Sequence, residues 1–138
     1  MSEKSRIIFD TNLWISFLIT NNLTQLDSAL ISKKCIILFS QELLDEFIEV
    51  AARPKLRKYF DNGALENLIE TIEKFSEFID VTSEVKFLKD PKDDFLLSLA
   101  LDGNADYLIT GDKELLKVKN YGKTEIISFS EFTVKVLI

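Results

Sequence analysis

The sequence contains no histidine among its 138 residues, and it has only one cysteine, two prolines and four glycines. Without histidine, the chain cannot form a Ser-His-Asp or Cys-His active site, an imidazole-bound zinc site or a histidine general base. The single cysteine, Cys35, makes no disulfide framework, and we expect a small buried side chain that suits a reducing cytoplasm. Any catalysis must therefore depend on Asp, Glu, Lys, Tyr or Ser, or on a metal ion held by oxygen atoms.

Long apolar runs and an excess of positive charge are also missing. No run approaches the roughly 20 apolar residues that cross a bilayer, so the sequence predicts no contact with a membrane. The net charge of −6 argues against a protein that holds nucleic acid by bulk charge alone. Length and composition indicate a single soluble globular domain over residues 1–138.

Short apolar strands alternate with helices along the chain. The expected strands cover 6–9, 35–39, 77–82, 106–110 and 125–129. The expected helices cover 11–19, 23–33, 41–52, 64–76 and 93–102, with a helical turn through 116, a basic helix or turn in "RPKLRKYF", a loop over 85–92 and a last helix after Ser128. Ser40 is suited to cap the helix at 41–52, and Ser128 with Glu131 resembles a capping box. This alternation predicts a parallel sheet that is covered by helices on both faces.

Two aspartates follow expected strands directly. Asp10 ends "RIIFD", and Asp112 comes shortly after "YLIT". Because sites in such sheets form outside the carboxyl ends of the strands, both carboxylates are candidates for one site. Each aspartate also precedes a helical stretch, so N-capping explains each of them equally simply.

Two acids on helices are further candidates. On "QELLDEFIEVA", Glu46 lies nearest to the apolar face; the simpler interpretation is a boundary glutamate whose stem covers apolar surface. On "DDFLLSLALD", Asp93 projects among the leucines, whereas Asp94, Ser98 and Asp102 share the remaining polar face. Asp93 is also explained as a first-turn acid favoured by the helix dipole. A buried unpaired carboxylate is costly, so Asp93 must be paired, capping or metal-bound.

Three or four carboxylates in one place would repel one another and raise one another's pKa values. A divalent cation removes that repulsion. With oxygen ligands and no histidine, Mg²⁺ or Mn²⁺ is the natural ion.

Four motifs resemble those of PIN-domain ribonucleases, in the order and spacing of that family. They are "IIFDTNLWIS", "SQELLDEFIEVAARPKL", "DPKDDFLLSLALDGNADYLITGDKELL" and "IISFSEF". The chain resembles in particular the small bacterial and archaeal members that are classed as toxins of toxin–antitoxin systems. The resemblance implies a three-layer α/β/α fold, with a parallel sheet of about five strands and an acidic pocket at its carboxyl edge.

The resemblance also implies roles for single residues. Asp10, Glu46, Asp93 and Asp112 correspond to the four family acids, which bind Mg²⁺ or Mn²⁺ for metal-assisted hydrolysis of RNA phosphodiester bonds. Asn12 and Thr110 match polar positions that adjust the pocket by hydrogen bonding, and Asp90 and Asp94 are secondary candidates. A small antitoxin protein that binds the pocket and a homodimer are further expectations from the family.

Several alternatives remain open from the sequence. Arg53, Lys55, Arg57 and Lys58 are candidates for contacts with RNA phosphates, or they form a solvated basic turn. Trp14 and Phe17 are expected in the core rather than in base stacking. A PIN-like subunit that only binds a protein partner is the main rival function. Phosphotransfer domains are a weaker rival, because "FDTN" has Asn12 where a dehalogenase-like phosphatase has a second aspartate.

Overall fold

The computed structural model describes residues 4–20, 34–59 and 63–137. One sheet forms its centre, with the strand order β3-β2-β1-β4-β6-β5. The strands are β1 (Ser5–Phe9), β2 (Cys35–Phe39), β3 (Ser76–Phe78), β4 (Tyr107–Ile109), β5 (Asn120–Tyr121) and β6 (Thr124–Ile127). All neighbouring pairs are parallel except β5 and β6, which pair antiparallel. The predicted parallel sheet is therefore confirmed, with a two-residue antiparallel strand added at one edge.

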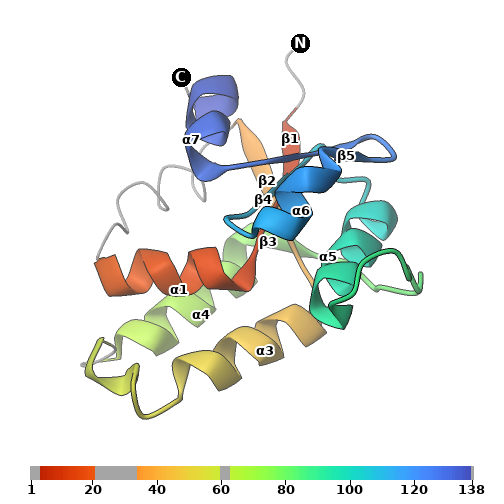
Figure 1. The fold of residues 1–138 in the computed structure, drawn as a ribbon. Coiled ribbons are helices and arrows are strands. Elements are labelled where there is room, and N and C mark those ends of the chain that lie inside the picture. The colour runs from red at the N-terminus through yellow and green to blue at the C-terminus, as the bar shows by residue number, and fades with distance from the viewer. Residues whose placement is uncertain (1–3, 21–33, 60–62, 138) are drawn as a thin grey trace.

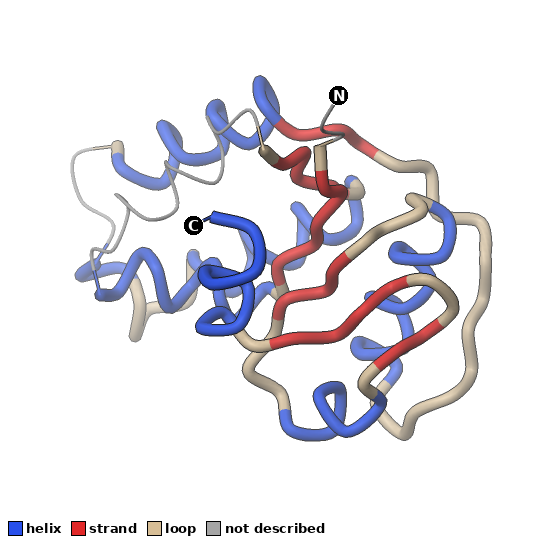
Figure 2. The backbone as a smooth tube through the Cα atoms, turned by 90° about the horizontal axis from the view of Figure 1, so that it is seen from above, coloured by secondary structure: helices blue, strands red, loops and turns tan. Residues whose placement is uncertain are grey.

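Helices cover both faces of this sheet. They are α1 (Thr11–Thr20), α3 (Gln41–Ala51), α4 (Ala64–Phe75), α5 (Pro91–Asp102), α6 (Lys113–Val118) and α7 (Phe129–Phe132), with a 3₁₀ turn η1 (Arg57–Tyr59) and a π-helical turn η2 (Thr133–Leu137). Figure 1 shows α1, α3 and α4 on one side of the sheet and α5 and α6 on the other, and Figure 2 shows the same layers from above. The expected three-layer α/β/α fold is confirmed. Within the described ranges, no helix has the length and apolarity to cross a membrane.

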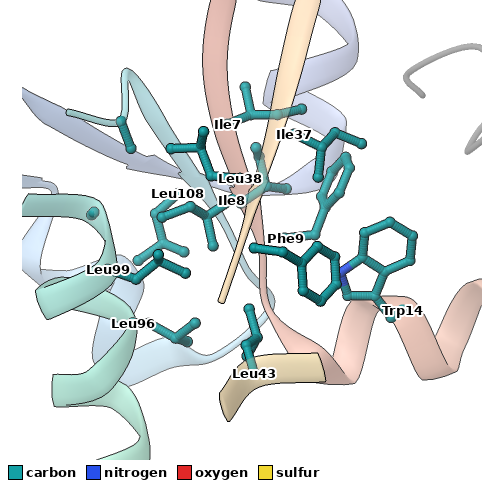
Figure 3. Close-up of a cluster of buried hydrophobic side chains, with 14 of the residues drawn as sticks. Ile7, Ile8, Phe9, Trp14, Ile37, Leu38, Leu43, Leu96, Leu99 and Leu108 are labelled. Atoms are coloured by element: carbon teal, nitrogen blue, oxygen red, sulfur yellow. The ribbon is translucent and has the colours of Figure 1, made fainter. Parts of the chain in front are cut away.

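The core lies on both faces of β1. This strand is in the middle of the sheet, and its apolar side chains are all buried. Ile7, Ile8 and Phe9 are each at most 1% exposed, as expected of a strand in the middle of a parallel sheet. In Figure 3, Ile8 lies on the side of Leu99 on α5, whereas Phe9 lies beside Trp14. The rings of Phe9 and Trp14 meet edge to face with centroids 5.5 Å apart. Trp14 and Phe17 thus belong to the core, as the sequence predicts.

The order of the strands defines where a site can form. Strands β2 and β3 follow β1 in the sequence and lie on one side of it in the sheet, whereas the later strands β4 and β6 lie on its other side. In such a sheet, the crevice at the reversal point, beyond the carboxyl ends of the two central strands, is the usual ligand site. Here these strands are β1 and β4, and Asp10 and Thr110 follow them directly.

Two expected strand boundaries are wrong. The strand expected over 77–82 covers only Ser76–Phe78, because its partner β2 ends at Phe39, where Ser40 starts α3. The last strand ends at Ile127 rather than at residue 129, because Ser128 caps α7 in the capping box that the sequence predicts. A short strand ends where its partner strand ends, and the hydrophobic pattern of the sequence does not show where that is.

The helices agree more closely with expectation. Ser40 Oγ accepts a 3.0 Å hydrogen bond from Leu43 N, which confirms the predicted cap of α3. Helix α5 begins at Pro91 instead of Asp93, because Asp90 caps it and proline is favoured in the first turn. The basic segment after Pro54 contains the short 3₁₀ helix η1. The helix expected over 23–33 lies outside the described residues.

Candidate active site

Asp10 lies at the carboxyl end of β1 and is held by the end of β4. Its side chain is buried, and its Oδ2 accepts a 2.8 Å hydrogen bond from the hydroxyl of Thr110. Its Oδ1 accepts a 3.2 Å hydrogen bond from the backbone N of Asn12, in the first turn of α1. Asp10 therefore caps α1, as the simpler interpretation proposes, and it still presents its carboxylate at the sheet edge.

Thr110 also positions Asp112. Its Oγ1 accepts a 3.0 Å hydrogen bond from Asp112 N while it donates to Asp10. Asp112 Oδ1 accepts a 2.8 Å hydrogen bond from Glu114 N and thereby caps α6. The buried Thr110 hydroxyl thus connects both strand-ending aspartates that the sequence singles out.

Helix α5 directs two further acids to the same place. Asp90 caps the helix through a 2.9 Å hydrogen bond from Lys92 N, and Asp93 follows in the first turn. The Asp93 side chain is buried, and this burial is the main reason why its pKa rises to about 6. The negative charges of Asp112, Asp90 and Asp10 raise the pKa further, as does a hydrogen bond with the Asp112 side chain. Asp93 is therefore close enough to three other carboxylates to interact with their charges.

Glu46 reaches the same place from α3. It is partly exposed, and its Oε1 lies 3.7 Å from Lys92 Nζ. This ion pair joins α3 to the first turn of α5. Because the Lys92 side chain is 67% exposed, solvent weakens the pair, and it contributes little to stability.

One cavity of about 160 Å³ brings these side chains together. The acids that line it are Asp10, Glu46, Asp90, Asp93 and Asp112. Asn12, Lys92 and Arg53 also line it. The structure thus gathers all four acids of the resemblance in one pocket, and the secondary candidate Asp90 joins them.

The donor set of this cavity suits a hard divalent cation, because every acidic ligand offers oxygen and the carboxylates repel one another. Burial raises the pKa of Asp93 most, and the negative charges of Asp112, Asp90 and Asp10 raise it further. With the side chains as they stand, however, no group of three or more acidic side chains is arranged to hold a metal ion, within the part of the chain that the structure describes. Binding a cation would require the side chains to turn toward a common point.

Other candidate residues lie elsewhere. Asp94 is buried but faces the segment before α5, where its Oδ1 accepts hydrogen bonds from Phe87 N and Leu88 N. Lys55, Arg57 and Lys58 are exposed and do not line the cavity. Of the four basic candidates only Arg53 reaches it, and Arg53 also pairs with Glu49 at 3.5 Å.

Sequence reasoning missed Lys92 as a cavity residue. A usable signal was present, since the lysine lies between Asp90 and Asp93 in "DPKDD". With Arg53, its side chain brings positive charge to a cavity that five acidic side chains line. A cation placed there is suited to meet a phosphate group.

The comparison with protein families is consistent with this geometry. A family model described as "PIN domain" matches residues 6–114, which include Asp10, Glu46, Asp93 and Asp112. A search of curated proteins finds no match. The PIN domain is a nuclease-type fold, and its members typically use divalent metals. Because the match spans most of the sequence, the chain belongs to the PIN domain family.

Proposed function

We propose that this protein is a Mg²⁺- or Mn²⁺-dependent endoribonuclease that hydrolyses phosphodiester bonds of RNA. The observation that carries the proposal is the cavity at the carboxyl ends of β1 and β4, which five acidic side chains line. Membership of the PIN family supports a nuclease, and the resemblance of the four motifs to PIN ribonucleases supports RNA as the substrate.

Asp10, Glu46, Asp93 and Asp112 would hold the cation. A divalent cation at these carboxylates supplies Lewis-acid chemistry, which activates water and neutralises charge on a phosphodiester. Thr110 fixes the Asp10 carboxylate, and the hydrogen bond from Glu114 N fixes that of Asp112. Lys92 and Arg53 offer positive charge at the cavity rim, where they are suited to orient the phosphate. This division of roles requires no histidine.

The test is cleavage of labelled RNA with Mg²⁺ or Mn²⁺ by the parent, Asp10→Asn and Asp93→Asn, with EDTA as a blank. Asp45→Asn is the matched control, because Asp45 is an exposed acid of α3 that does not line the cavity. We expect cleavage by the parent and Asp45→Asn, and a loss of at least about a hundredfold in both cavity variants, whose folding is checked by thermal melts. Inactivity of the folded parent on RNA with both metals would overturn the proposal.

We further propose that the protein is the toxin of a toxin–antitoxin pair and acts in the cytoplasm. A small antitoxin would cover the acidic cavity, and the protein would dimerise, as the resemblance implies. Induced expression in bacterial cells tests the toxin role. Growth arrest by the parent and Asp45→Asn, but not by Asp10→Asn, is the expected result. Normal growth with full-length parent protein present would contradict it.

A PIN-like module that binds a protein and does not cleave RNA is the second candidate. It is favoured by one observation: the described acidic side chains do not converge on a common metal position as they stand. Titration of the parent with Mn²⁺, followed by its melting temperature at pH 7.5, separates the two. If Mn²⁺ raises the melting temperature of the parent but not that of Asp93→Asn, the nuclease is favoured. If Mn²⁺ does not raise the melting temperature of the parent, the binding module is favoured.

A further inference from the structure

A second pocket adjoins the acidic cavity. Asp90, Asp93 and Asp112 line both pockets, so the two are neighbours that share these three residues. On the far side, the second pocket is formed by residues 87–89 and Glu114. Whatever chain occupies the acidic cavity is therefore well placed to continue into this second pocket.

Phe87 is the most unusual residue of the second pocket. Its side chain is 60% exposed, more than that of any other aromatic residue in the described part of the chain. Its ring lies against Tyr121 of β5, with centroids 5.8 Å apart and planes inclined by 50°. One partner ring supports Phe87 while much of its surface remains open to solvent. The exposed ring stands in a pocket that adjoins the acidic cavity, so its open face is available to a ligand.

The backbone around Phe87 is held in place. We call residues 81–89 the strap; it is the green loop beside α5 in Figure 1. Asp94 Oδ1 accepts hydrogen bonds from Phe87 N at 3.1 Å and Leu88 N at 2.7 Å, and Ser98 Oγ accepts one from Val85 N at 3.0 Å. The polar face of α5 thus fixes the strap, so Phe87 is presented in a defined position before any ligand binds.

Two lysines lie close to Phe87 in the sequence. Lys86 and Lys89 are exposed on either side of Phe87 and Leu88 in "KFLK", and Lys89 lines the pocket. Neither lysine has an ion-pair partner among the residues that the structure describes. In a chain of net charge −6, these cations stand close to the most acidic site. An exposed aromatic ring with a lysine in the same pocket suits a nucleotide, whose base stacks on the ring while a phosphate pairs with the cation.

We propose that Phe87, with Lys86 and Lys89, binds one unpaired nucleotide of single-stranded RNA next to the bond that the acidic cavity cleaves. This inference rests on the proposed ribonuclease function, and it assigns a nucleotide subsite to residues outside the acidic cavity. A base that stacks on Phe87 must leave its helix, so the substrate is single-stranded at this position. Phe87 is a positioning residue, because it lies outside the acidic cavity.

The experiment measures binding separately from cleavage. A single-stranded oligoribonucleotide that carries 2-aminopurine is titrated into Asp10→Asn protein, and stacking is detected as quenching of the base fluorescence. In this background Phe87→Leu removes the ring but keeps apolar bulk, and Phe87→Trp keeps a stacking face. Phe75→Leu is the matched control, because Phe75 is an exposed aromatic of α4 that lines neither pocket.

We expect Phe87→Leu to weaken binding and quenching by about tenfold or more, and Phe87→Trp and Phe75→Leu to retain both. Lys89→Gln is expected to weaken binding and to reduce its salt dependence. Unchanged affinity in Phe87→Leu, equal losses in Phe75→Leu, or no binding of single-stranded RNA would overturn the inference.

The two proposals fail in different ways. Binding that depends on Phe87, in a protein that cleaves no RNA, would refute the ribonuclease and keep the nucleotide site. If Phe87→Leu cleaves and binds RNA as the parent does, the ribonuclease proposal stands and the nucleotide site is refuted. If Phe87→Leu instead abolishes binding of a protein partner and leaves RNA binding unchanged, the surface serves protein recognition and the nucleotide site is refuted.

Discussion

The hydroxyl of Thr110 donates a 2.8 Å hydrogen bond to Oδ2 of Asp10, across the ends of two neighbouring strands. Thr110 Oγ1 also accepts a 3.0 Å hydrogen bond from Asp112 N. Thr110 itself is fully buried. One small side chain therefore holds the first acid of the cavity against the loop that carries the last acid, before any cation is present.

Replacing Thr110 by valine tests this arrangement. Valine keeps the shape of the side chain but leaves the buried Asp10 carboxylate without its hydroxyl donor, so we expect the free energy of unfolding to fall by about 1–3 kcal/mol. Urea denaturation measures the change. Thr110→Ser is the control, because it keeps the hydroxyl and loses only a methyl group. Equal stability of the valine variant and the parent would show that the hydrogen bond does not contribute.

The raised pKa of Asp93 predicts a pH dependence of stability in metal-free protein. Because folding raises the pKa of Asp93 from 3.8 to about 6, this carboxyl is more protonated in the folded state than in the unfolded state between these two pH values. The contribution of Asp93 to the free energy of unfolding therefore decreases as pH rises through this range, and it stays low above about 6. Asp93→Asn removes this penalty, so we expect it to be more stable than the parent at pH 7.5 and equally stable near pH 3.5.

Thermal melts in EDTA from pH 3.5 to 7.5 measure this difference between variant and parent. Taking the difference matters, because the lowered pKa values of Asp102 and Glu77 give the opposite slope in both proteins. Glu70→Gln, at an exposed position of α4, should show a flat difference. A flat difference for Asp93→Asn as well would mean that folding does not raise the pKa of Asp93.

Replacing the neighbouring Asp94 should lower the stability of the protein, whereas replacing Asp93 should raise it at pH 7.5. The Asp94 carboxylate accepts two backbone N–H groups of the strap, so Asp94→Ala leaves both donors without their partner. We expect a loss of about 1–3 kcal/mol in the free energy of unfolding. Hydrogen exchange at the amides of Phe87 and Leu88 should also accelerate. Glu84→Ala, at an exposed strap position, is the control; if Asp94→Ala leaves both amides as protected as Glu84→Ala does, the strap is held by other contacts.

These two aspartates show what the sequence could predict and what it could not. Helical periodicity correctly directed Asp93 toward the apolar side of α5. The same reasoning placed Asp94, Ser98 and Asp102 on a polar face, and that face carries the strap: Thr82 N and Ser83 N donate to Asp102 at 2.7 and 2.8 Å. Backbone donors from a distant segment leave no trace in the periodicity of a helix, so this role could not be foreseen.

The fold followed from local patterns where those patterns were strong. Buried strands such as β1 and caps such as Ser40 and Ser128 were predicted at or near their observed positions. Strand β5 was missed, because two residues give no periodic signal. Asp10 and Asp112 were found by topology, since carboxyl ends of parallel strands share one edge, whereas Glu46 and Asp93 were found from helical periodicity and the family resemblance. Lys92 was missed although it lies between Asp90 and Asp93 in the sequence; only its contact with Glu46 depends on how α3 and α5 approach each other.

Close contact between α5 and the sheet gives the last prediction. A Cβ atom added to Gly103, directly after α5, would lie 2.8 Å from Leu38 Cδ1 on β2 and 3.0 Å from Leu99 O. Gly103→Ala must push the helix end or Leu38 aside, so we expect the free energy of unfolding to fall by about 1–3 kcal/mol. At Gly111 an added Cβ meets no atom within 4 Å, so Gly111→Ala should change stability by less than about 0.5 kcal/mol. Urea midpoints of the two variants decide the matter: if both equal the parent's, the end of α5 is not tightly packed against β2.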